Sequence, residues 1–201
     1  MNVFAFDIDG TLLDSSDVDS RLYLESVERV LGNVELRSHW SDYEHVTDQG
    51  LLKSIILDNR LEHESLLIGK VKREFFQALK DYLNAHGPFR QIPGAREFVE
   101  SLRRSDNTRI VYATGGWRDS ASLKLQTSGF PLEGIPLGCS DDHDDRPSIM
   151  RNAVASLSVK PHTITYYGDG TWDKVACEKL GWRFVAVGME LGGIEDYRTD
   201  A

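Results

Sequence analysis

Two carboxylates, Asp7 and Asp9, stand one residue apart directly after an apolar run at residues 3–6. The run is typical of a buried strand, and Gly10 and Thr11 end it at once. The two carboxylates leave a strand on the same face, unless the chain has already begun to turn. Acids placed so repel each other and lose hydration, and Mg²⁺ relieves both costs. The stretch therefore predicts a metal-assisted site, whereas Asp-Gly alone would indicate only a polar turn.

A hydroxyl and two glycines, Thr114, Gly115 and Gly116, follow a second apolar run at residues 110–113. A hydroxyl beside backbone N–H groups that glycine leaves open makes a small anion cradle, especially just before a helix. On the tripeptide alone, a strand-to-helix turn with a hydroxyl cap is the better explanation. The order of the motifs along the chain is what favours an anion site.

Two further acids, Asp169 and Asp173, follow a third apolar run at residues 163–167. Asp169 would be a metal ligand at the strand end. Asp173, one helical turn later, would bind the metal directly or hold a water bound to it. The alternative is an Asp N-cap with a favourable acid in the first helical turn. The pattern G-D-G-x-x-D, about 160 residues after D-x-D-G-T, is far more specific than either motif alone.

Short apolar runs alternate with helical patterns outside one long segment. Strands are expected at residues 3–6, 110–113, 135–138, 163–167 and 183–187, and helices at 95–102, 120–127, 148–157 and 174–180. This alternation predicts an α/β fold with a Rossmann-like parallel sheet that is covered on both faces. Ligands bind at the carboxyl ends of strands in such sheets, where Asp7, Thr114 and Asp169 fall.

The long exception, residues 14–88, carries helical patterns and almost no strand signal. We therefore predict two units, a core domain of residues 1–13 and 89–201 and a small α-helical cap domain of residues 14–88.

The set and order of motifs resembles the haloacid dehalogenase-like (HAD) hydrolase superfamily, over the whole chain. The resemblance implies that Asp7 is a phosphoryl-accepting nucleophile and Asp9 a general acid/base. It implies Mg²⁺ held by Asp7, the main-chain carbonyl of Asp9, Asp169 and Asp173. Thr114 would bind the transferring phosphoryl group, and many HAD enzymes carry a helical cap at the same point of the chain.

Polar groups near the middle of the predicted cap, among them His45 and Thr47, are candidates for substrate contacts, because a loop at about this point faces the active site in the capped enzymes of the family that the motifs resemble. Each of them singly is more typical of a solvated surface or a helix cap.

The third motif of the family is normally a lysine, often followed by proline, and here the slot reads Arg146-Pro147. Arginine keeps the charge and can fork onto phosphate oxygens, but it is not an equivalent point charge. We expect Arg146, with Thr114 and Gly115, to stabilise the phosphoryl oxygens. The alternative cations are Lys160, Lys124 and Arg118, and the alternative role for Arg146 is a surface ion pair with Asp142, Asp144 or Asp145.

The whole chain narrows the choice of partners. Its net charge of −9 argues against nucleic acid and anionic membrane, but not against a small phosphorylated substrate. The two cysteines, Cys139 and Cys177, form no C-x-x-C, which favours reduced thiols in a cytoplasmic protein. We expect neither a signal peptide nor a membrane span, and we expect a monomer or weak dimer.

The predicted function is hydrolysis of a small phosphorylated metabolite by a Mg²⁺-dependent phosphatase, through an aspartyl-phosphate. A sugar-phosphate mutase of the same superfamily would share every core motif. A haloacid dehalogenase needs neither the metal nor the second acid, so Asp9 and Asp169 argue against it. A phosphonate hydrolase would use a cap lysine, for which Lys53 is the candidate. A non-catalytic phosphometabolite-binding protein is the alternative from another class.

Overall fold

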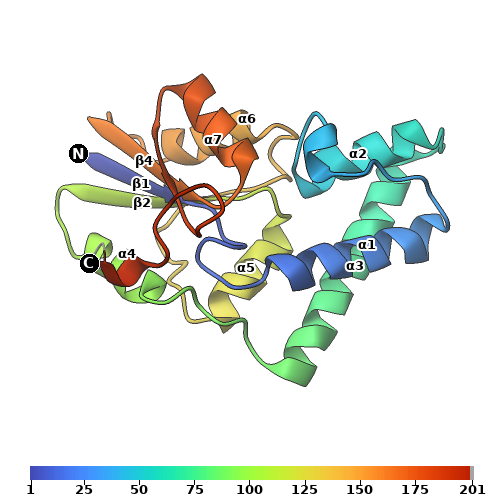
Figure 1. Cartoon of the computed structure of the whole chain (residues 1–201), viewed down its shortest axis with the longest axis horizontal. Helices are drawn as coiled ribbons and strands as arrows, with labels where there is room; N and C mark the ends of the chain where they lie inside the picture. The colour runs from blue at the N-terminus through green and yellow to red at the C-terminus, as the bar shows by residue number, and fades with distance from the viewer. Residues whose placement is uncertain (200–201) are drawn as a thin grey trace.

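A five-stranded parallel sheet forms the centre of the computed structural model, which describes residues 1–199 (Figure 1). Its order is β3-β2-β1-β4-β5. The strands are β1 (Asn2–Phe6), β2 (Thr108–Ala113), β3 (Leu137–Gly138), β4 (Thr163–Gly168) and β5 (Arg183–Ala186). The predicted α/β fold with a parallel sheet is confirmed. The edge strand β3 pairs only at Leu137 and Gly138, so it is shorter than the sequence predicts.

Four helices follow the strands in turn, namely α4 (Ala95–Arg103), α5 (Arg118–Thr127), α6 (Arg146–Ala155) and α7 (Thr171–Leu180), with a short η2 (Tyr197–Thr199) near the end. Helices α5, α6 and α7 each begin two or three residues before the predicted start. First-turn residues carry no apolar periodicity, so the hydrophobic pattern does not mark these starts. A side chain caps α6, whereas the N-cap residues Trp117 of α5 and Gly170 of α7 make no side-chain cap hydrogen bond. In α6, the Asp145 carboxylate accepts a hydrogen bond from Ser148 N at 2.9 Å, and Pro147 occupies the first turn.

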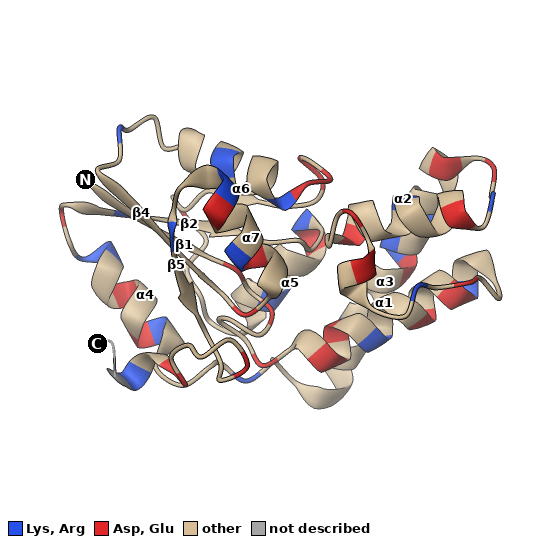
Figure 2. Ribbon diagram, turned by 45° about the horizontal axis from the view of Figure 1, so that its top comes forward, with Lys and Arg blue, Asp and Glu red and all other residues tan. Residues whose placement is uncertain are grey.

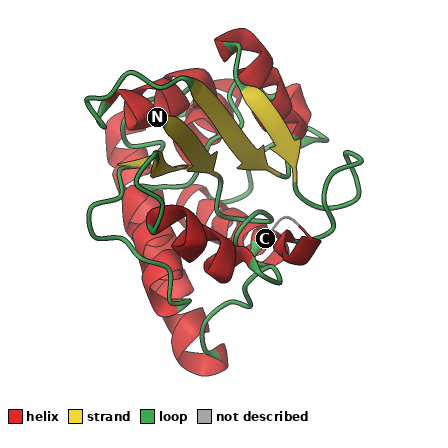
Figure 3. Cartoon of the chain, turned by 90° about the vertical axis from the view of Figure 1, so that its left-hand side faces the viewer, coloured by secondary structure: helices red, strands yellow, loops and turns green. Residues whose placement is uncertain are grey.

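Alternate residues of β1 pack on opposite faces of the sheet, which helices cover on both sides (Figure 3). Val3 and Ala5 are fully buried in one apolar cluster with residues of α6 and α7. Phe6 is buried in a second cluster, where its ring lies 6.1 Å from that of Phe98 in α4. Both faces of the strand are therefore dry, which is why its sequence is apolar without interruption.

The segment between β1 and α4, residues 14–88, is helical and lies to one side of the sheet (Figure 1). It contains α1 (Ser16–Leu31), the short η1 (Trp40–Asp42), α2 (Asp48–Asp58) and α3 (Glu64–His86). We call it the helical insertion. Trp117, just before α5, joins it to the core, because its ring centroid lies 5.8 Å from those of both Tyr23 in α1 and Phe75 in α3.

Charged positions of both signs are spread over the insertion and the core (Figure 2). Helix α6 is an exception, because its two charged residues, Arg146 and Arg151, are both basic. Over residues 1–199, none of the helices has the length and apolar character needed to cross a membrane.

Candidate active site

Three polar residues follow three adjacent strands at the carboxyl edge of the sheet. Asp7 follows β1, Thr114 follows β2 and Asp169 follows β4. The register pairs Phe6 with Tyr112 on one side and with Tyr167 on the other. Asp7 therefore lies level with Ala113 and Gly168, and Thr114 and Asp169 come one residue further along their strands. The Asp7 backbone continues the ladder, since its N–H donates to Tyr167 O at 2.9 Å. Rigid strands thus position these side chains next to one another.

Arg146, the first residue of α6, lies in this site and not on the surface. Its Nη1 is 3.1 Å from Asp7 Oδ2 and 2.9 Å from Asp173 Oδ1, and it is only 8% exposed. Burial lowers the pKa of the guanidinium, but the two carboxylates outweigh it and raise that pKa. Arg146 is therefore a permanent positive charge beside Asp7.

The acids near Arg146 in the sequence have other partners, which removes the predicted alternative of a surface ion pair. Arg118 Nη2 binds Asp142 at 2.7 Å, and Lys53 Nζ binds Asp144 at 2.6 Å. Arg118 and Lys53 therefore form their ion pairs with the loop before α6. Of the cations weighed for the third motif, Arg146 is the one that contacts Asp7.

Two glycines are required by close approach of site residues. Gly10 has φ +70°, and a Cβ there would meet Asp169 Oδ2 at 1.9 Å. A Cβ on Gly115 would meet Arg146 Nη2 at 2.5 Å and Val46 O at 3.1 Å. Gly116 is less crowded, although its N–H donates to Thr114 Oγ1 at 3.2 Å. Glycine at 115 therefore lets the Arg146 guanidinium approach the backbone just after Thr114, which brings a hydroxyl and a cation together as an anion cradle requires.

Asp7, Asp169 and Asp173 bring carboxylate oxygens within 4.8 Å of one another. Burial is the largest cause that raises the pKa of Asp169 to about 8, and repulsion by Asp7 and Asp173 adds to it. Burial likewise raises the pKa of Asp173 to about 7 against the attraction of Arg146. Among the described residues, Asp7 Oδ1 is buried without a hydrogen-bond partner. An orphaned oxygen among crowded acids fits a hard divalent cation.

Asp173 also organises the turn into α7. Its carboxylate accepts from Gly170 N at 3.2 Å while the other oxygen holds Arg146. Tyr166 OH, which donates to Ala113 O at 2.7 Å, lies 3.3 Å from that same oxygen. Asp173 is fully buried and joins Arg146 to the first turn of α7.

Asp9 turns to a different partner, a buried lysine. Lys124 Nζ lies 2.7 and 2.6 Å from the two oxygens of Asp9 and 2.6 Å from Asp19 Oδ1 in α1. Ser15 Oγ donates to Asp9 Oδ1 at 2.5 Å. The Lys124 side chain is 0% exposed, and the two carboxylates raise its pKa although burial opposes this. One ammonium therefore ties Asp9 in the core to the first turn of the insertion.

We expect Lys124→Met to lower the free energy of unfolding by about 3 kcal/mol, because it leaves two carboxylates without their cation. The matched control is Lys53→Met. Its ion pair with Asp144 is 36% and 31% exposed, so its loss should cost less than about 1 kcal/mol. Urea unfolding measures both. Equal effects for the two variants would contradict a structural role for the Lys124 pair.

The loop before α2 is hydrogen-bonded to the core around the site. Asp48 N donates to Gly115 O at 2.8 Å, and Thr47 Oγ1 donates to Asp144 O at 2.7 Å. Trp117 N donates to Asp48 Oδ2 at 2.9 Å. These contacts bring the insertion over the cradle.

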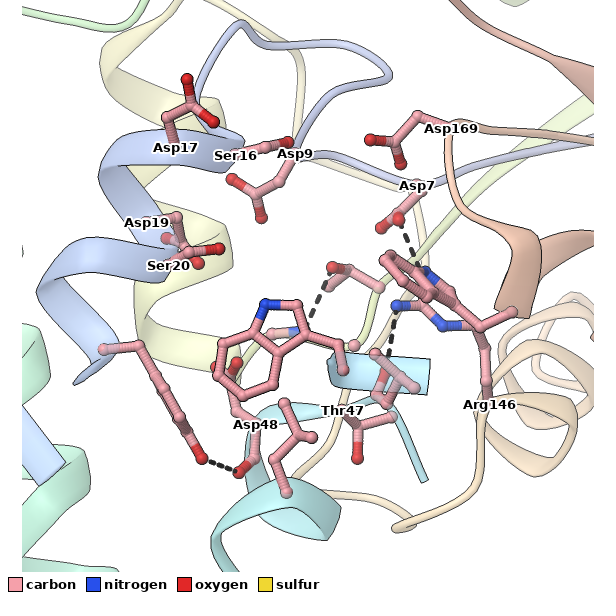
Figure 4. Close-up of a pocket in the computed structure, with 18 residues that line it drawn as sticks. Asp7, Asp9, Ser16, Asp17, Asp19, Ser20, Thr47, Asp48, Arg146 and Asp169 are labelled. Carbon is pink, nitrogen blue, oxygen red and sulfur yellow. Dashed lines mark hydrogen bonds and ion pairs between the residues drawn. The ribbon is translucent and has the colours of Figure 1, made fainter. Parts of the chain in front are cut away.

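The site opens into a cavity of about 340 Å³ between the core and the insertion (Figure 4). The core contributes Asp7, Asp9, Thr114, Arg146, Asp169 and Trp172. The insertion contributes Ser16, Asp17, Asp19, Ser20, Tyr23 and Trp40, together with Val46, Thr47, Asp48 and Leu51.

Of the predicted substrate contacts, Thr47, Gly115 and Gly116 line this cavity. His45 is not among its lining residues, and its Nε2 lies 4.0 Å from Glu44 Oε1 instead. The α1 residues and Lys124's role in holding Asp9 were not predicted from the sequence. The signal for the former was present, because Ser16 and Ser20 recur at one helical turn.

Comparison with known proteins agrees with this geometry. A model of the haloacid dehalogenase-like hydrolase family matches residues 1–181. No curated protein has a sequence that matches this chain significantly.

Solved structures share the fold at low sequence identity. A hydrolase from Pseudomonas syringae is 22% identical with a TM-score of 0.75, over 97% of this chain and 90% of that one. CbbY from Rhodobacter sphaeroides, in complex with phosphate, is 18% identical with a TM-score of 0.68, over 97% and 94%. β-Phosphoglucomutase from Clostridium difficile is 14% identical with a TM-score of 0.70, over 92% and 84%.

Proposed function

Since the chain belongs to the haloacid dehalogenase-like hydrolase family, we propose that it is a Mg²⁺-dependent phosphatase acting on a small phosphorylated metabolite. The observation that carries the proposal is the grouping of Asp7, Thr114 and Asp169 at three adjacent strand ends, with Arg146 3.1 Å from Asp7. Phosphate bound to CbbY, a protein of the same fold, supports a phosphorylated substrate.

Asp7 is the nucleophile of the proposed reaction. One carboxylate oxygen attacks phosphorus, the bond to the leaving oxygen breaks, and an aspartyl-phosphate forms. Arg146 neutralises the charge of the transferring group, and Thr114 with the N–H of Gly115 donates hydrogen bonds to its oxygens. Glycine at 115 is needed for this, because a Cβ there would lie 2.5 Å from Arg146 Nη2 and push the guanidinium away.

Asp9 is the proposed proton carrier. It gives a proton to the leaving oxygen and later takes one from the water that hydrolyses the aspartyl-phosphate. Lys124 and Ser15 hold its carboxylate, which lines the cavity and is 19% exposed. Because Lys124 also binds Asp19, it links the position of Asp9 to α1. The helical insertion, residues 14–88, thus acts as the cap.

Mg²⁺ fits the acids of the core. Asp7, Asp169 and the main-chain carbonyl of Asp9 would hold it, with Asp173 as a direct or water-mediated ligand. Bound there, the ion would supply Lewis-acid polarisation of the phosphoryl group. It would also offset the burial and the repulsion by Asp7 and Asp173 that together raise the pKa of Asp169 to about 8.

The alternatives from the same chemistry have less support. Lys53, the lysine that a phosphonate hydrolase would use, is absent from the cavity lining and pairs with Asp144. A haloacid dehalogenase has no use for the acids at 169 and 173.

Two free, buried cysteines, Cys139 and Cys177, support the expected cytoplasmic location.

The test is release of inorganic phosphate from an aryl phosphate with and without Mg²⁺. We expect turnover that saturates with Mg²⁺ and is abolished by excess EDTA, because the acids cannot be crowded around a phosphate dianion without a cation. Re-addition of Mg²⁺ after EDTA is the control for irreversible unfolding. Turnover that is unchanged in EDTA would contradict the proposed metal dependence.

A further inference from the structure

The two sides of the cavity differ in the cations that they offer. The core side carries the acids Asp7, Asp9 and Asp169, but it also holds Arg146, which with the anion cradle would receive the phosphoryl group. The insertion side holds Asp17, Asp19 and Asp48, and Figure 4 shows Asp17 and Asp19 across the cavity from Arg146. Within residues 1–199, the insertion lines the cavity with no lysine, arginine or histidine. The leaving group of a substrate would therefore meet acids.

Nearby cations are bound to acids and cannot reverse this charge. The single ammonium of Lys124 forms ion pairs with both Asp9 and Asp19, and its side chain is fully buried. Two lysines of the insertion form ion pairs with acids of the core: Lys53 binds Asp144, and Lys72 binds Asp141. Neither of these two lysines lines the cavity.

The acids of the insertion side share one cation, Lys124, which contacts Asp19 and is also bound to Asp9. Burial is the main cause that raises the pKa of Asp48 well above its usual value, and repulsion by Asp19 adds to it. Burial and repulsion by Asp9 raise the pKa of Asp19 to about 6, even with Lys124 in contact. A second anion brought here would worsen the repulsion, whereas a hydrogen-bond donor or a cation would relieve it.

Aromatic and hydroxyl groups complete this side. Tyr23 and Trp40 line the cavity with ring centroids 6.2 Å apart, beside the hydroxyls of Ser16 and Ser20. Aromatic faces attract ammonium groups and pack against C–H groups of an alcohol. The cavity volume of about 340 Å³ suits a phosphoryl group with a small alcohol attached.

We propose that the leaving group is a small alcohol that bears hydroxyl or amine groups and carries no second phosphate or carboxylate. This inference rests on the proposed phosphatase function and names its substrate class. It also argues against a mutase, because moving a phosphoryl group between two hydroxyls passes through a bisphosphate. The second phosphate would lie against Asp17, Asp19 and Asp48.

The test uses three phosphomonoesters of equal length whose leaving groups differ in charge, namely 2-aminoethyl phosphate, 2-hydroxyethyl phosphate and phosphoglycolate. We expect kcat/KM for the better of the first two to exceed that for phosphoglycolate at least about tenfold. The amine and the hydroxyl compound compared with each other distinguish a cationic from a neutral leaving group. Glucose 6-phosphate against glucose 1,6-bisphosphate extends the comparison to a second phosphate.

A charge reversal on the cavity wall provides the matched variant. The measured quantity is the ratio of kcat/KM for the better of the amine and hydroxyl esters to kcat/KM for phosphoglycolate. Asp17→Lys should lower this ratio at least about fivefold, because it places a cation on the insertion side. The control is Glu28→Lys, which makes the same change of charge on the same helix away from this cavity. It should leave the preference unchanged.

Binding to the Asp7→Asn variant by calorimetry separates this inference from the proposed function. If the wild type releases no phosphate but the variant still binds the amine or hydroxyl ester more tightly than phosphoglycolate, the substrate class holds and the phosphatase proposal fails. A preference for phosphoglycolate or the bisphosphate, in turnover or in binding, would overturn the inference. So would equal effects of Asp17→Lys and Glu28→Lys on the preference.

Discussion

Asp7→Asn is expected to reduce phosphate release by a factor on the order of 10⁴ or more, which is the scale of losing a nucleophile. The amide has nearly the same shape and is a far poorer nucleophile. The neutral amide can still contact Arg146, so the fold should survive. Steady-state release of phosphate from an aryl phosphate measures the loss, with circular dichroism to confirm folding.

The matched control is Asp14→Asn. Asp14 is exposed, lies outside the cavity and is seven residues further along the same chain segment. Its substitution should leave turnover within about twofold of the wild type. If Asp7→Asn retained a tenth or more of the activity, the nucleophile would have to be another group.

Arg146→Ala is expected to have the second largest effect, a loss on the order of 10³ in kcat/KM. The guanidinium is the positive charge in contact with Asp7, and without it the attacking carboxylate and the phosphate repel each other. The variant also leaves Asp173 buried without its cation, so it should be less stable by about 3 kcal/mol.

Arg146→Lys separates charge from geometry. A lysine keeps the charge but cannot span Asp7 and Asp173 with a planar fork, so we expect recovery of part of the rate and most of the stability. Turnover at fixed Mg²⁺ and urea unfolding report the two effects separately. If Arg146→Lys were as inactive as Arg146→Ala while folding normally, the fork and not the charge would be the essential feature.

The fold and the core of the site could be predicted from the sequence, because their signals are local. A strand buried on both faces has an uninterrupted apolar run. The polar residue that follows such a strand lies at the carboxyl edge of the parallel sheet, whatever the order of the strands. The motif positions alone therefore predict that Asp7, Thr114 and Asp169 lie together. The glycines at 10 and 115 are visible in the sequence. The neighbouring atoms that leave no room for a Cβ there, Asp169 Oδ2 and Arg146 Nη2, could not be predicted from it.

The partners of buried charges could not be predicted in the same way. Lys124 lies in a helix pattern that gives no hint of burial, and its two acids are 105 and 115 residues away in the chain. Arg146 had several acids nearby in sequence, yet it pairs with Asp7 and Asp173. His45 is predicted from its place in a loop that faces the active site in related capped enzymes, yet its Nε2 lies 4.0 Å from Glu44 Oε1. Long-range electrostatic pairing depends on packing that a local pattern does not encode.

The measurement that tests the account most directly is capture of the aspartyl-phosphate. Wild-type protein with Mg²⁺ and an aryl phosphate is quenched in acid during turnover, digested and examined by mass spectrometry. We expect a phosphate adduct on the peptide that contains Asp7, located at that residue, and none in Asp7→Asn. A fully active enzyme with no adduct, or with an adduct on a different residue, would contradict Asp7 as the nucleophile.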